Sequence, residues 1–132
     1  FYCDTRNKND IKQFDDLLIR KKSETLDVII DDASHIYSDI LNNFKNFFKK
    51  VKPGGFYVIE DFNHYKYYPH LNDSPSNSLE IEEIFKFLNN KQIFKSDNLN
   101  NDFQHYCFNS IAEITIHKGI QDDSYIAFIK KK

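Results

Sequence analysis

Glycine and cysteine are scarce in this sequence, and methionine and tryptophan are absent. The three glycines among 132 residues form no GxGxxG-like loop of the kind that cradles a nucleotide phosphate. The two cysteines lie far apart, without the spacing of a zinc site or a disulfide framework. Because Met and Trp are missing, 13 Phe and 8 Tyr supply most of the large side chains available for a core.

Long apolar runs and a strong net charge are also missing. No stretch approaches the roughly 20 apolar residues that cross a bilayer, and no signal-peptide pattern opens the chain. The formal net charge is -2, so bulk electrostatics does not favour a nucleic-acid partner. Together with cysteines that need not be oxidised, these absences predict a cytoplasmic protein with neither a membrane nor a nucleic-acid partner.

The apolar residues that are present recur at the spacing of helices and strands in turn. Runs that are apolar on consecutive positions are typical of strands buried on both faces, and a period near 3.6 indicates amphipathic helices. The predicted elements are helices at 9–22, at 38–51 with Ser38 as N-cap, and from about 78, and strands at 26–31, 56–60, 111–119 and 124–132. The last two strands should pair antiparallel. We therefore expect an α/β fold with a mostly parallel sheet.

Two pairs of acidic residues end two of these buried strands. Asp31 and Asp32 close the run LDVIIDD, and Glu60 and Asp61 close FYVIED. If the strands are parallel neighbours, their carboxyl ends lie at one edge, about 4.8 Å apart. Carboxylates that close repel unless a cation compensates, and oxygen ligands favour Mg²⁺, with Mn²⁺ or Ca²⁺ as alternatives. Side chains alternate along a strand, so Asp31 and Asp32 should not both be ligands.

His35 lies three residues beyond Asp32, in the loop that would cover this edge. It is a candidate general base there, because the ordinary pKa of an imidazole lies near working pH. A loop histidine is also commonly no more than a hydrogen-bonded or solvated side chain. Asp and Ser after a strand are likewise ordinary turn formers and helix caps. The residues alone leave both interpretations open.

The stretches DVIIDDASH (27–35) and KPGGFYVIED (52–61) resemble the core of the metal-dependent class I S-adenosylmethionine methyltransferases. They are similar in particular to the group that O-methylates macrolide sugars and related glycosides, whose pattern cephalosporin hydroxylase-like proteins share. The resemblance implies a Rossmann-like class I methyltransferase sheet that ends in an antiparallel strand pair. It also implies that the first two strands are missing, so that residues 1–132 are a single partial domain, the C-terminal portion.

The resemblance also implies roles for individual residues. Asp32, Glu60 and Asp61 would hold the Mg²⁺ or Mn²⁺ ion, and Asp32 is preferred to Asp31 because its spacing suits the family. His35 then falls where the family keeps its catalytic base. Asp31 would face the cofactor side or the turn after the strand.

Further implied features concern the cofactor and the acceptor. The segment FYCD (1–4) resembles a strand whose last residue, Asp4, meets the adenine of S-adenosylmethionine. Ala33 stands where the family has glycine, a mild change unless its φ is positive. The loop 63–78 would form a wall for a sugar-like or other small-molecule acceptor. We expect an S-adenosylmethionine-dependent, Mg-assisted O-methyltransferase, inactive as residues 1–132 alone, and a homo-oligomer is allowed.

Two other classes of protein stay open. Since the cofactor loop is absent from this chain, it would also suit a non-catalytic, degenerate methyltransferase-like module. A receiver-like signalling domain uses strand-end aspartates and Mg²⁺ as well. That domain needs a lysine after its last parallel strand, and no lysine is so placed here.

Overall fold

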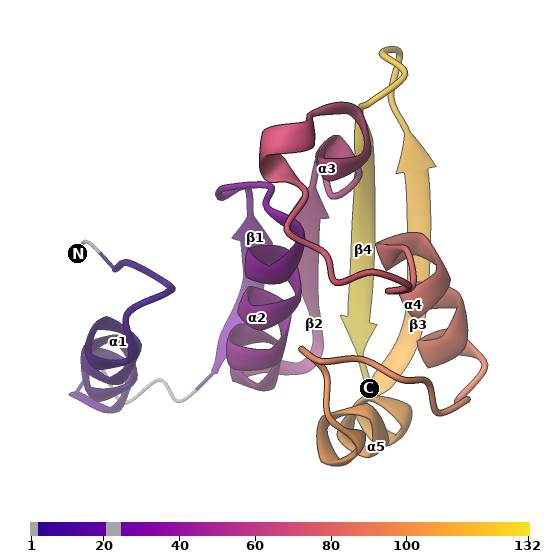
Figure 1. Cartoon of the computed structure of the whole chain (residues 1–132). Helices are drawn as coiled ribbons and strands as arrows, with labels where there is room; N and C mark the ends of the chain where they lie inside the picture. The colour runs from indigo at the N-terminus through magenta and orange to yellow at the C-terminus, as the bar shows by residue number, and fades with distance from the viewer. Residues whose placement is uncertain (1–2, 21–24) are drawn as a thin grey trace.

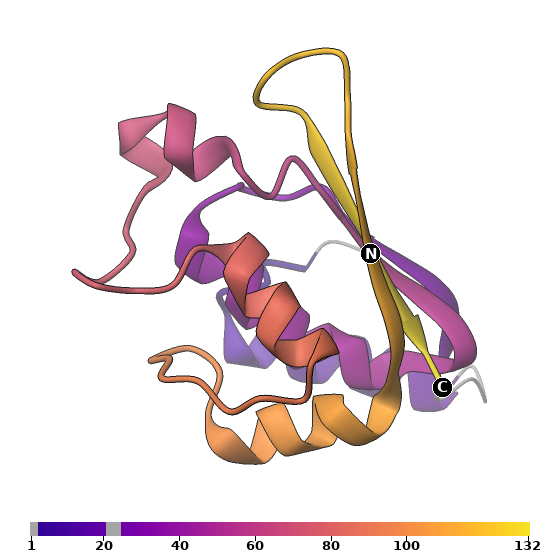
Figure 2. The ribbon, with the colours of Figure 1, turned by 90° about the vertical axis from the view of Figure 1, so that its right-hand side faces the viewer.

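The computed structural model describes residues 3–20 and 25–132 of the chain. The elements are α1 (Lys8–Arg20), β1 (Leu26–Asp31), α2 (Tyr37–Phe47), η1 (Phe48–Lys50), β2 (Val51–Glu60), α3 (His64–Tyr67), η2 (Pro69–Leu71), α4 (Ile81–Asn89), α5 (Asn101–Ser110), β3 (Ile111–Lys118) and β4 (Tyr125–Lys131). The strands form one sheet (Figure 1), and helices α2, α4 and α5 lie together on one of its faces (Figure 2). Within the described residues, no helix is both long and apolar enough to cross a bilayer.

The sheet has the strand order β1-β2-β4-β3. Strands β1 and β2 are parallel, whereas β4 is antiparallel to both of its neighbours, β2 and β3. The predicted α/β class and the antiparallel pair at the end of the chain are confirmed. The expected mostly parallel sheet is not what the described strands form, since one pair among them is parallel and two are antiparallel. Apolar runs report burial and not direction, so they do not reveal that β4 inserts beside β2.

Helix α2 joins β1 to β2 and supplies a large part of the core. Ile40, Leu41 and Phe44 are buried, as the periodic spacing predicts. The predicted N-cap is wrong: Ile36 occupies that position. Ser38 instead donates hydrogen bonds from its backbone N–H and its hydroxyl to the carboxylate of Asp73, which ties the loop after β2 to the start of the helix.

Two adjacent glycines shape the entry into β2. Gly54 has φ 80°, a left-handed conformation that side chains other than glycine rarely adopt. At Gly55 a Cβ atom would lie 2.4 Å from the carbonyl oxygen of Asp27 on the neighbouring strand. The strand begins at Val51, earlier than the predicted start at residue 56, and it includes Gly54 for its backbone conformation and Gly55 for its close packing.

Strand β1 is apolar on both faces, but only one face is covered by the described helices. Ile29 packs against the core, whereas Val28 and Ile30 are 49% and 61% exposed. The prediction of a strand buried on both faces is therefore not met within the described residues. The reason is that α2, α4 and α5 all lie on the same side of the sheet (Figure 2).

The two remaining helix predictions concern the end of the first helix and helix α5. The end of the first helix was expected at Lys21 and Lys22, which are outside the described residues. Helix α5 was not predicted, because its apolar residues lack a clear helical period. Its buried Gln104 donates to the carbonyl oxygens of Phe94 and Leu99 and so holds the loop before it against the helix.

Candidate active site

The ends of β1 and β2 lie side by side at one edge of the sheet, as the sequence predicted. Asp31 pairs in register with Ile59, so the next step along both strands sets Asp32 level with Glu60. Neighbouring parallel strands keep in-register side chains on the same face of the sheet. Asp31, the last residue of β1, leaves the sheet on the face where α2 packs, and Asp32 follows just beyond the strand.

Asp31 is a buried residue of that packed face. It is only 8% exposed, and its carboxylate accepts hydrogen bonds from Tyr57 Oη at 2.9 Å and Asn43 Nδ2 at 3.3 Å. Burial raises the pKa of Asp31 despite these two donors. Burial and the neighbouring Asp31 charge raise the pKa of Tyr57 well above its ordinary value. Asp31 is thus held by the core, in contrast to Asp32, whose side chain is 60% exposed.

His35 lies in the loop that follows β1. Its φ is 56°, and its Nε2 atom lies 3.6 Å from Oδ1 of Asp32. Ala33 is not among the described residues with positive φ, so the replacement of the family glycine is of the mild kind. The loop therefore places an imidazole directly beside the first acidic residue of the site.

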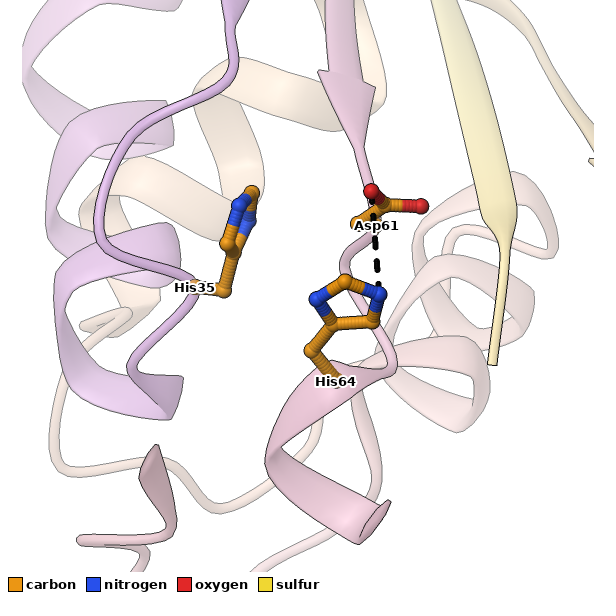
Figure 3. Close-up of side chains that lie close together, drawn as sticks. All are labelled: His35, Asp61 and His64. Atoms are coloured by element: carbon orange, nitrogen blue, oxygen red, sulfur yellow. Dashed lines mark ion pairs between the residues drawn. The ribbon is translucent and has the colours of Figure 1, made fainter. Parts of the chain in front are cut away.

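The loop after β2 brings in His64, a residue that the sequence prediction missed. Asp61, with φ 49°, points toward His64, and Oδ2 of Asp61 lies 3.6 Å from Nε2 of His64 (Figure 3). The same nitrogen lies 3.7 Å from Oδ2 of Asp123. A signal for His64 was present in the sequence, because Asp61-x-x-His64 repeats the spacing of Asp32-x-x-His35.

The predicted site residues converge only in part. One candidate ligand atom from each of His35, Asp61 and His64 lies within 4.8 Å of the others. Among the described residues, Asp32, Glu60 and Asp61 do not form a group that tight. Carboxylates repel one another, so a cation is needed to draw three of them together. Their assignment as metal ligands stays a prediction.

Asp4 lies in the N-terminal segment and is engaged locally. Its carboxylate accepts hydrogen bonds from the backbone N–H of Arg6 at 3.0 Å and from Arg6 Nε at 3.2 Å, and the first of these contacts contributes most to lowering the pKa of Asp4. In the predicted strand FYCD, Phe1 and Tyr2 lie outside the described residues, and neither Cys3 nor Asp4 is in a strand. The cofactor role of Asp4 stays a prediction.

An open cavity of about 380 Å³ lies between this segment and β1. Cys3 and Thr5 line one side, and Asp31, Asp32 and Ala33 line the other. The cavity is where the expected cofactor edge would be, next to the strand end that carries the acids. The assignment of Asp31 to the cofactor is likewise a prediction, since its two hydrogen bonds are to the protein core.

The aromatic loop after β2 is fastened to the turn between β3 and β4. Tyr67 Oη donates to the carbonyl oxygen of Asp122 at 2.8 Å, and Tyr68 Oη donates to Oδ2 of Asp123 at 2.8 Å. The second bond lowers the pKa of Asp123 and raises that of Tyr68. The loop is therefore held in place over the site edge, between α2 on one side and this turn on the other.

The order of elements, the reversed last strand pair and the acids at adjacent strand ends together define a class I methyltransferase-like fold. No protein-family profile matches the chain. Mycinamicin VI 2''-O-methyltransferase of Micromonospora griseorubida is 44% identical over 43 residues, 33% of this chain and 11% of that protein. The 8-demethyl-8-alpha-L-rhamnosyl tetracenomycin-C 2'-O-methyltransferase of Streptomyces olivaceus is 44% identical over 36 residues, 27% of this chain and 10% of that protein.

Two solved structures of MycE methyltransferase from the mycinamycin biosynthetic pathway are similar along the whole chain. The complex with Mg and SAH has a TM-score of 0.62 at 24% identity and covers 99% of this chain and 32% of that one. The complex with Mg, SAH and mycinamycin VI has a TM-score of 0.61 at 25% identity, covering 99% and 31%. The chain thus spans about a third of these structures, and the stretches aligned with the curated relatives make up about a tenth of those proteins. The resemblance to the macrolide and sugar O-methyltransferase group is confirmed.

Proposed function

We propose that the protein carrying this chain is an S-adenosylmethionine-dependent, Mg²⁺-assisted O-methyltransferase that acts on a hydroxyl of a sugar-like acceptor. One observation carries the proposal. His35 lies where the parallel strands β1 and β2 end, beside Asp32, which follows β1, and Asp61, which follows β2. The curated relatives are named as sugar O-methyltransferases, and the MycE complexes hold Mg and SAH. These comparisons support the proposal.

The donor set suits the ion. Asp32, Glu60 and Asp61 offer carboxylate oxygens, the ligand type that Mg²⁺ prefers, and the strand register sets the first two level with each other. When bound there, the ion would lower the pKa of an acceptor hydroxyl, and S-adenosylmethionine would supply the methyl group. That residues 1–132 form the C-terminal part of the domain is included in this proposal, with the cofactor meeting Asp4 and Asp31 along the cavity beside β1.

His35 is proposed as the catalytic base. An imidazole nitrogen of His35 takes the proton of the acceptor hydroxyl, and the carboxylate of Asp32 at 3.6 Å stabilises the positive charge that the ring then carries. The loop conformation holds the ring on the site side of β1. Holding the base close to the acceptor hydroxyl in the right orientation lowers the entropic cost of proton transfer and so increases the rate.

The loop 63–78 is proposed as the wall of the acceptor site. Tyr67 and Tyr68 are 47% and 41% exposed, while their hydroxyls are held by the turn between β3 and β4. Rings that are exposed yet anchored present apolar surface at little cost in side-chain entropy. Such surface suits the apolar face of a deoxysugar.

The test is methyl transfer by the natural full-length protein, followed as SAH release. Mycinamicin VI and simple rhamnosides serve as acceptors, with EDTA and with Mg²⁺ restored. We expect chelation to abolish transfer and Mg²⁺ to recover it. Glu60→Gln should lose Mg²⁺ dependence and most of the activity, whereas Glu113→Gln, the same change at an exposed position of β3, should leave it unchanged. Activity that is indifferent to EDTA would overturn the metal role.

A second measurement separates the enzyme from a non-catalytic module. Calorimetry of the natural protein with S-adenosylmethionine should show a binding isotherm. No binding by the natural protein would mean that it is a methyltransferase-like module without the cofactor, and the proposed activity would then be wrong.

A further inference from the structure

Three side chains at the site edge form a group that the proposed methyl transfer does not use as a unit. His35 comes from the loop after β1, Asp61 from the end of β2 and His64 from the first residue of α3 (Figure 3). Their candidate ligand atoms all lie within 4.8 Å of one another. Two nitrogens and one carboxylate oxygen therefore converge where the proposed Mg²⁺ ligands are all oxygens.

The convergence is held by the backbone as well as by the side chains. The N–H of His64 donates to the carbonyl oxygen of Asp61 at 3.0 Å, which closes a tight turn between the two ligands. The rings of His35 and His64 meet edge to face with centroids 5.0 Å apart. All three side chains are between 20% and 31% exposed, so a small ion can reach them while most of their surface is packed.

Charges around the group favour a cation. Asp32 lies beside His35, and Asp61 and Asp123 both lie beside Nε2 of His64. Three carboxylates thus face two imidazoles. Negative charge of this kind attracts a cation to the group.

We propose that His35, Asp61 and His64 form a second divalent-ion site that selects a first-row transition ion, such as Zn²⁺, and overlaps the oxygen-only site through Asp61. Imidazole nitrogens favour Zn²⁺, Co²⁺ and Ni²⁺ over Mg²⁺, which prefers oxygen. Ligand bonds to Zn²⁺ of about 2.0–2.2 Å place tetrahedral ligand atoms roughly 3.3 Å apart. The ligand atoms of the observed group, which lie within 4.8 Å of one another, would have to approach to that spacing when the ion binds.

The site has a consequence for the proposed reaction. An ion bound by His35 occupies the nitrogen that would otherwise take the proton, and the shared Asp61 prevents both ions from binding fully at once. Transition ions then inhibit methyl transfer in competition with Mg²⁺. This consequence rests on the proposed function, whereas the binding itself does not.

The first experiment observes the ligands directly. The natural protein, labelled with ¹⁵N in its histidine rings, is titrated with Zn²⁺, which is diamagnetic. We expect the ring nitrogens of His35 and His64 to shift together, with His70, His105 and His117 unmoved as internal controls. Zn²⁺ that leaves His64 unmoved overturns the proposal.

The second experiment separates the two sites by their ions. By calorimetry, His64→Gln should weaken Zn²⁺ binding at least about tenfold and change Mg²⁺ affinity by less than about threefold. Glu60→Gln should do the reverse, and the exposed His70→Gln should do neither. Equal Zn²⁺ affinity in His64→Gln and the natural protein overturns the second site.

Folding and function are controlled separately. Circular dichroism checks each variant, and His35→Asn replaces His64→Gln if the latter does not fold, because Asn tolerates the positive φ of position 35. It should weaken Zn²⁺ binding to a similar extent, and unchanged affinity counts against the site. If Zn²⁺ binds as proposed but no acceptor is methylated, the proposed function fails while the second site stands.

Discussion

The loop after β1 and the loop after β2 carry the same short pattern, an aspartate followed three residues later by a histidine. In both pairs the closest approach of nitrogen and oxygen is 3.6 Å. In the first loop the histidine has the positive φ, and the side chain of Asp32 is 60% exposed. In the second loop Asp61 has the positive φ and is 31% exposed, and a further carboxylate, Asp123, lies beside the histidine.

This difference indicates a division of work between two similar loops. The first loop leaves its imidazole next to a single, solvated acid, an arrangement suited to accepting a proton and passing it on to water. The second loop confines its carboxylate between strand end and ring, an arrangement suited to a fixed ligand. Equal spacing in the sequence therefore does not imply equal roles, because the residue with the left-handed backbone differs between the loops.

The largest effect is expected at Asp61, which belongs to both donor sets. Asp61→Asn keeps the size of the side chain and tolerates the positive φ, so it removes charge with little strain. We expect methyl transfer to fall about 1000-fold, because metal-assisted charge stabilisation is worth several kcal/mol. Steady-state kinetics of the natural protein and the variant would measure this. Asp122→Asn, the same change at an exposed turn residue, is the control, and a similar loss there would break the comparison.

A smaller loss is expected at His35, the proposed proton acceptor of the first loop. His35→Asn should lower kcat about 100-fold, the lower range for removal of a general base. The deficit should shrink as pH rises, because hydroxide replaces the missing base. Rate profiles of the two proteins between pH 6 and 9 would show it. A deficit that does not change with pH would mean that His35 only positions other groups.

The smallest effect concerns stability and compares the hydrogen bond to buried Asp31 with the hydrogen bond to the more exposed Asp123. Tyr57→Phe removes a hydrogen bond to a buried carboxylate and should lower the free energy of unfolding at pH 7 by roughly 1–3 kcal/mol. Tyr68→Phe, which removes a hydrogen bond to a more exposed carboxylate, should lower the free energy of unfolding by less than Tyr57→Phe does. Chemical denaturation of both variants measures the difference. Equal costs would show that the burial of Asp31 does not matter.

The sign of the pH dependence follows from the raised pKa of Asp31. Its contribution to stability is fully present below its unfolded pKa, near 3.8, and is lost as pH rises through the higher folded value. Loss of the Tyr57 donor raises the folded pKa further, so the cost of Tyr57→Phe should be larger at pH 7 than at pH 3. A cost that is largest in acid would contradict the assignment.

Much of the fold could be predicted because its signals are local. The apolar runs at β1 and β2 indicate strands, and the acids that end them are evident in the sequence. The insertion of β4 between β2 and β3 could not be predicted, since no local pattern reports which strands are neighbours. Helix α5 was missed because its buried side chains do not form a regular apolar stripe. One of them, Gln104, is polar and donates hydrogen bonds to the preceding loop.

The site was predictable at one loop and not at the other. His35 follows a recognisable strand end, whereas His64 lies in an aromatic segment that the sequence presents as acceptor wall. Its approach to His35 depends on α3 turning back toward the sheet, which is a tertiary effect. Asp32, Glu60 and Asp61 do not form a tight group among the described residues, and their role as metal ligands stays a prediction.

The turn at 119–124 has an influence that its distance along the chain conceals. The phenol groups of Tyr67 and Tyr68, 55 residues earlier in the chain, donate hydrogen bonds to this turn. One bond goes to a main-chain oxygen and the other to a carboxylate. The β3–β4 hairpin therefore supports the loop 63–78, which is proposed to receive the acceptor. Inserting residues into this solvent-exposed turn would weaken the hydrogen bonds that hold the loop 63–78 in place, although the insertion touches no reacting group.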